Sequence, residues 1–126
     1  MTDAAAVAVG AAAVVTGTVL MNQNQNSGPD YVVSPDGTAY PVPKGASGPT
    51  DVVNPAGNVT GSAFTGGTGG ANGQVSSMRL MDPTPPRGNS PGYPNGYVKY
   101  ENSNGQGVDP YTGRTLPNSQ SHFPIQ

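Results

Sequence analysis

Residues 97–108, which read YVKYENSNGQGV, decide the fold. In the first half of this stretch, Val98 and Tyr100 would point to one side of a β-strand, while Lys99 and Glu101 would point to the other. An Asn-Gly dipeptide follows, and such a pair typically closes a β-hairpin. The stretch therefore predicts an antiparallel hairpin with one apolar face and one polar, charged face.

Two flanking segments extend this hairpin into a small sheet. Residues 74–81, QVSSMRLM, alternate in the same way, with Met78 and Leu80 on one face and Arg79 on the other. The closing HFPI, residues 122–125, predicts a last edge strand, because its proline lacks a backbone donor. The proline-rich loop between the first two strands excludes helix there. Asp-Pro-Tyr-Thr-Gly-Arg predicts a type I turn whose glycine takes a positive φ.

The N-terminal half carries different signals. Residues 4–21 are an uncharged, Ala-rich run that favours a helix, with a membrane-lying segment as the alternative. Residues 28–73 contain turn dipeptides every few positions and predict an irregular linker, with one short strand around 31–33. We therefore expect a helical lead-in over 1–27, a Gly/Pro-rich linker, and a small folded domain over 74–126.

These segments together predict an α+β or mainly β fold: a small antiparallel sheet with long Pro/Gly-rich loops, preceded by an Ala-rich helical segment. Composition agrees with a small core, because the 126 residues include 19 glycines and 14 prolines. The absence of cysteine excludes disulfides and thiolate metal sites. A formal net charge of −2 argues against binding duplex nucleic acid by phosphate neutralisation alone.

The C-terminal residues resemble a known family. Residues 78–125 read MRLMDPTPPRGNSPGYPNGYVKYENSNGQGVDPYTGRTLPNSQSHFPI and contain four ordered elements, at Met81–Thr84, Pro94–Tyr100, Gly105–Arg114 and His122–Ile125. This ordered set resembles the C-terminal toxin domains of Rhs/YD-repeat polymorphic toxins. The resemblance implies an antibacterial effector that an Rhs shell or secretion machinery delivers into the target-cell cytoplasm. It also implies a cognate immunity protein, and nuclease activity is the usual expectation for such short domains.

The chain has few titratable side chains, and this limits the catalytic mechanisms that it could use. Cleavage of RNA without a metal needs a base for the 2′-hydroxyl proton, an acid for the leaving oxygen and cations around the phosphorane. Glu101 and His122 are the only glutamate and histidine in the chain, so they are the only pair of that kind. We predict that the last strand sets His122 across from Glu101, with no cofactor. The predicted catalytic residues are His122, Glu101, Arg79 and Arg114, and the predicted substrate-binding residues are Lys99, Tyr97 and Tyr111.

Other interpretations stay open at this point. A metal-dependent DNase would draw on Asp82, Asp109 and His122, which is a thin ligand set. A membrane-depolarising toxin would act through residues 4–21, which allow a transient membrane contact. The charged residues of the polar face could also be a solvated surface, and Asp109 before a proline is a common turn residue. If the polar face binds RNA, an immunity protein would cover it with acidic side chains.

Overall fold

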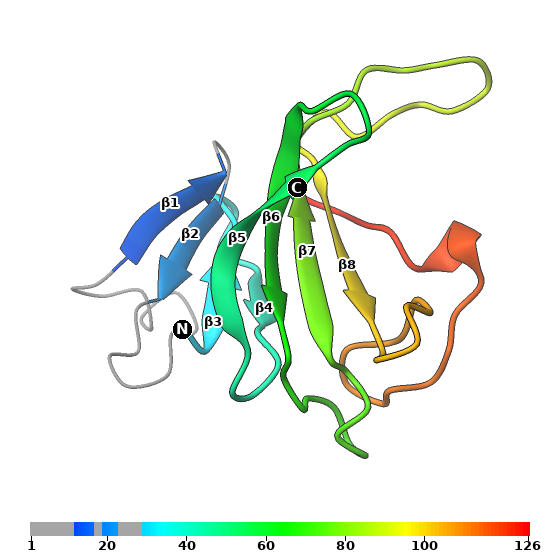
Figure 1. The fold of residues 1–126 in the computed structure, drawn as a ribbon. Coiled ribbons are helices and arrows are strands. Elements are labelled where there is room, and N and C mark those ends of the chain that lie inside the picture. The colour runs from blue at the N-terminus through cyan, green and yellow to red at the C-terminus, as the bar shows by residue number, and fades with distance from the viewer. Residues whose placement is uncertain (1–11, 17–18, 23–28) are drawn as a thin grey trace.

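The computed structural model describes residues 12–16, 19–22 and 29–126, which form two antiparallel sheets around one core (Figure 1). The first sheet contains β1 (Ala12–Thr16), β2 (Val19–Asn22), β3 (Tyr31–Val33) and β4 (Ala39–Pro41), in that order. The second contains β5 (Ser47–Val53), β6 (Val59–Thr65), β7 (Ser77–Met81), β8 (Tyr97–Glu101) and β9 (Phe123–Pro124), again in that order. One 3-10 turn, η1 (Asn118–Gln120), is the helical element of the described part. The mainly β fold with small antiparallel sheets is confirmed.

The strands predicted from alternation, β7 and β8, pair along their whole length. Their apolar side chains form the inner face, where Met78, Leu80, Val98 and Tyr100 are at most 1% exposed. The residues that alternate with these in β7 and β8, among them Arg79, Lys99 and Glu101, form the outer face. β9 pairs with β8 as the predicted edge strand, and the hairpin after β8 also forms, because the backbone N–H of Gly105 donates to the Asn102 carbonyl.

Residues 28–73 are not an irregular linker, and the predicted domain division at residue 74 is wrong. This region holds β3, β4, β5 and β6, and β6 pairs directly with β7 across the proposed boundary. The turn signals close hairpins here. In the NPAGN turn between β5 and β6, the Asn54 side chain accepts from the N–H groups of Ala56 and Asn58, and Gly57 takes a φ of 88°.

The Ala-rich segment is also different from the prediction. Its described residues form the β1–β2 hairpin instead of a helix, and β2 continues the sheet by pairing with β3. Valine and threonine follow the alanines in this stretch, and these β-branched residues favour strands when a partner strand is present. Residues 4–11 and 17–18 lie outside the described residues. Within the described part of the chain, no helix is both long enough and apolar enough to cross a membrane.

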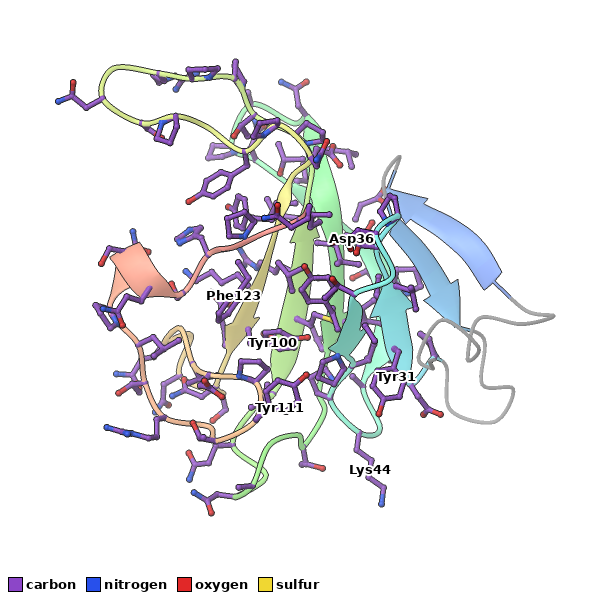
Figure 2. All side chains as sticks on the ribbon, turned by 180° about the vertical axis from the view of Figure 1, so that it is seen from behind. Tyr31, Asp36, Lys44, Tyr100, Tyr111 and Phe123 are labelled. Atoms are coloured by element: carbon purple, nitrogen blue, oxygen red, sulfur yellow. The ribbon has the colours of Figure 1, made fainter. Side chains whose placement is uncertain are left out.

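The core lies between the two sheets. Val32 and Val42 come from the first sheet and its following loop, and they join Phe64, Met78 and Leu80 of the second in one buried cluster. Tyr100 connects the sheets directly, because its hydroxyl donates a 2.7 Å hydrogen bond to the carbonyl of Pro41 at the end of β4. Figure 2 shows Tyr100 at this junction, seen from behind. The outer face of β7 and β8 is left for polar side chains.

Candidate functional site

Three charged side chains gather on the outer face of the five-stranded sheet, and we call them the charged cluster: Arg79, Lys99 and Glu101. β7 and β8 position them, because Arg79 and Lys99 are cross-strand partners and Glu101 is two residues further along β8. The Glu101 carboxylate lies 3.7 Å from the Arg79 guanidinium and 3.5 Å from the Lys99 ammonium. One carboxylate thus holds two cations, and this face carries a net positive charge.

Three rings lie at the other end of β8, and we call them the aromatic cluster: Tyr93, Tyr97 and His122. The Tyr97 ring centroid is 4.7 Å from those of both Tyr93 and His122. The Tyr93 and His122 rings are nearly parallel, with centroids 6.0 Å apart. Burial, and after it the neighbouring Tyr93, raises the pKa of Tyr97, so its phenol stays a neutral hydrogen-bonding group at ordinary pH. The rings offer a partly exposed stacking surface.

A hydrogen bond fixes the tautomer of His122. Its Nδ1 lies 2.9 Å from the backbone carbonyl of Asn118, the first residue of η1. A carbonyl oxygen can only accept, so Nδ1 must carry a proton and donate it. Nε2 is then the ring nitrogen that can accept a proton or, in the charged imidazolium, release one. The imidazole is therefore oriented for proton transfer through a single atom.

The predicted position of His122 directly across from Glu101 is wrong by two residues of the strand register. β9 pairs Phe123 with Val98 and Pro124 with Tyr97, so continuing the register sets His122 beside Lys99. The imidazole also packs against the Tyr97 ring, whereas the Glu101 carboxylate forms ion pairs with Arg79 and Lys99. Lys99 thus lies between the carboxylate and the imidazole on the outer face.

An open depression of about 510 Å³ lies next to Lys99. The hairpin residues 105–107, the segment 115–118 and the buried Ser121 complete its lining. Asn118 belongs both to this lining and to the hydrogen bond that orients His122. Lys99 of the charged cluster and Asn118, which orients His122, therefore line the same depression.

Two predicted site residues lie elsewhere. Arg114 follows the 109–113 turn and lines a neighbouring depression with Asp109, on the other side of the shared segment 115–117. Tyr111 is 65% exposed and lines a pocket on the inner-face side of the sheet, together with Tyr100. Neither joins the charged cluster, because both belong to a turn whose course depends on packing instead of strand alternation.

The three residues considered for a metal site do not come together. Asp109 accepts backbone N–H groups of its own turn, and these bonds lower its pKa. Asp82 begins the loop after β7, and His122 lies against the aromatic cluster. Among the described residues, no group of three or more His, Cys, Asp or Glu side chains could hold a metal ion.

Sequence reasoning missed two residues of this site. Tyr93 is half-buried against His122 and Tyr97. Its spacing from Tyr97, four residues across a Pro-Asn-Gly turn, is the signal that could have indicated contact. Asn118 gave no signal, since it acts through its backbone carbonyl. No protein-family model, curated protein or solved structure matches this chain.

Proposed function

We propose that this chain is an antibacterial effector domain of the Rhs polymorphic-toxin type that cleaves single-stranded RNA without a metal. One observation carries the proposal: the charged cluster and the aromatic cluster occupy the same face, and Lys99 lies between Glu101 and His122. The resemblance of residues 78–125 to these toxins adds the biological context.

Substrate binding follows from the two clusters. Single-stranded RNA is recognised largely by stacking of its unpaired bases on aromatic side chains, and each stacked base contributes about 1–3 kcal/mol. Tyr93, Tyr97 and His122 offer such a surface. Lys99 is the next residue of β8 on the same face as Tyr97, and Arg79 is its cross-strand partner, so these two cations could bind the phosphate next to a stacked base. Because the charged cluster contributes two cations, RNA affinity would rest on stacking more than on counterion release.

The order of the side chains suits an in-line transphosphorylation. The Glu101 carboxylate accepts the 2′-hydroxyl proton, the 2′-oxygen attacks phosphorus, and the bond from phosphorus to the 5′-oxygen breaks. His122 in its imidazolium form gives the Nε2 proton to that leaving oxygen. The products are a 2′,3′-cyclic phosphate and a free 5′-hydroxyl. A base and an acid on opposite sides of the phosphate are what an in-line displacement needs, and Lys99 between them offsets the developing charge.

Partners and delivery complete the proposal. An Rhs shell or secretion machinery would carry the domain into the cytoplasm of a rival cell, and a cognate immunity protein would protect the producer. The surface that such a protein must cover is the outer face with Arg79 and Lys99. Acidic side chains that imitate RNA phosphates would do this best, and association would weaken as salt is raised.

The test is a cleavage assay with purified protein on total RNA and on plasmid DNA, each with and without EDTA. We expect RNA cleavage that EDTA does not abolish, and at least a tenfold loss of rate in Lys99→Ala. Lys44→Ala is the matched control, because Lys44 is exposed in the loop after β4, outside both clusters. Cleavage of DNA alone, or cleavage that EDTA stops, would contradict the proposal.

A further inference from the structure

A second concave site lies on the inner-face side of the five-stranded sheet, away from the charged cluster. Its volume is about 250 Å³, and four aromatic rings line it: Tyr40 of β4, Tyr100 of β8, Tyr111 of the 109–113 turn and Phe123 of β9. Figure 2 shows Tyr100, Tyr111 and Phe123 together on this side of the molecule. The site is thus built where the two sheets and the turn meet.

The walls of this pocket are held rigidly. The Tyr100 and Phe123 rings stand edge to face, with centroids 6.4 Å apart and planes at 65°, so they form two sides of a corner. The hydrogen bond from the Tyr100 hydroxyl to Pro41 fixes the first of these rings. Tyr40 is half-buried and Tyr111 stands at the rim. The Tyr100 and Phe123 rings are therefore held in place by contacts within the protein.

One carboxylate belongs to the lining of the aromatic pocket, that of Asp109. Asp36 supplies a second one in the turn between β3 and β4, just before the lining residues 38–41. Asp109 accepts N–H groups at 2.8 and 2.9 Å, and Asp36 accepts the Ser34 hydroxyl and the Thr38 N–H. These bonds lower the pKa of both groups, so both are ionised at neutral pH. Arg114 neighbours Asp109, but no Lys or Arg lines the pocket among the described residues.

We propose that this aromatic pocket binds a methylated organic ammonium ion, such as a choline group. The negative faces of tyrosine and phenylalanine rings attract cations, and aromatic cages are a recurring means of binding quaternary ammonium groups. A small metal ion would need several oxygen ligands, which the apolar ring and proline walls do not supply. An anion would meet two carboxylates. A cation whose surface is methyl groups satisfies both the charge and the apolar walls.

This inference goes beyond the proposed RNA cleavage and does not depend on it, because the two sites share no side chain. The probe is choline, titrated into the full chain while tyrosine fluorescence and amide NMR shifts are followed. The neutral isostere 3,3-dimethylbutan-1-ol has the same shape without the charge, so it separates cation recognition from simple apolar binding. We expect choline to bind more tightly than the isostere by about 2- to 30-fold, the range of one to several cation–π contacts.

Variants locate the site. Tyr111→Ala should weaken choline binding by a similar factor, and Asp109→Asn should weaken it while keeping the turn, since asparagine can accept the same N–H groups. Tyr31→Ala is the matched control, because Tyr31 is another exposed tyrosine that does not line the pocket. Vesicles of phosphatidylcholine and phosphatidylglycerol then distinguish a lipid headgroup from the free cation. Equal binding of choline and its isostere, or binding unchanged by Tyr111→Ala, would overturn the proposal.

Discussion

Replacing Tyr100 by phenylalanine removes one hydroxyl at the junction of the two sheets. This hydroxyl donates a 2.7 Å hydrogen bond to the Pro41 carbonyl, and the Tyr100 side chain is 1% exposed. The ring and its contacts with Phe123 remain, so the packing change is small. A lost hydrogen bond costs about 0.5–1.5 kcal/mol, and leaving its part-buried acceptor without a partner can raise this cost to about 1–3 kcal/mol. We therefore expect the free energy of unfolding to fall by about 1–2 kcal/mol.

Urea denaturation followed by circular dichroism measures this change, and the slope of the transition should stay the same. The melting temperature should fall by about 3–10 °C for a chain of this size. Tyr31→Phe is the matched control, because Tyr31 is exposed on β3 and its variant should unfold like the wild type. A wild-type midpoint for Tyr100→Phe would refute the reasoning that this bond connects the two sheets.

Three further outcomes follow from the fold. Burial raises the pKa of Tyr100 well above its ordinary value, so the stability that its neutral phenol contributes is complete below pH 10 and is lost as the pH rises further. The wild type should therefore lose stability above pH 10 more steeply than Tyr100→Phe does. Urea midpoints measured at successive pH values would show this difference. Gly61→Ala should destabilise the protein by about 2 kcal/mol or more in the same assay, because its Cβ would lie 2.4 Å from the Leu80 carbonyl oxygen. A chain that begins at residue 74 should show no cooperative melting, since it lacks β6, the partner of β7; a cooperative transition would restore the linker interpretation.

The sequence predicted the parts of the fold that rest on local alternation. In β7 and β8, five-residue runs alternate cleanly, and their inner faces are buried as expected. In the first sheet, the short strand predicted around 31–33 is present as β3, but the sheet as a whole could not be predicted, because a period of two is not visible in strands of three residues such as β3 and β4. The Gly- and Pro-containing turns of this region were interpreted as linker signals, although the turns between β3 and β4 and between β5 and β6 close hairpins of strands that are adjacent in the chain.

The candidate site likewise contains residues whose position could be predicted from strand alternation and residues whose position could not. Arg79, Lys99 and Glu101 share a face because strand alternation and cross-strand pairing bring them together, and both can be read from sequence. Arg114 and Tyr111 lie away from the charged cluster, because the path of the turn that carries them depends on tertiary packing. The register of β9 is two residues away from the expectation, since a two-residue edge strand gives too little pattern to fix it.

In the proposed RNA cleavage, Glu101 is the base and His122 is the acid. The measurement that tests this pair is single-turnover cleavage of a short single-stranded RNA by the wild type, Glu101→Gln and His122→Ala, with the product ends identified. We expect 2′,3′-cyclic phosphate ends and a loss of rate by about 10²–10⁴ in each variant, while circular dichroism and melting stay like the wild type. Cleavage at the wild-type rate by either folded variant, or products with 5′-phosphate ends, would contradict it.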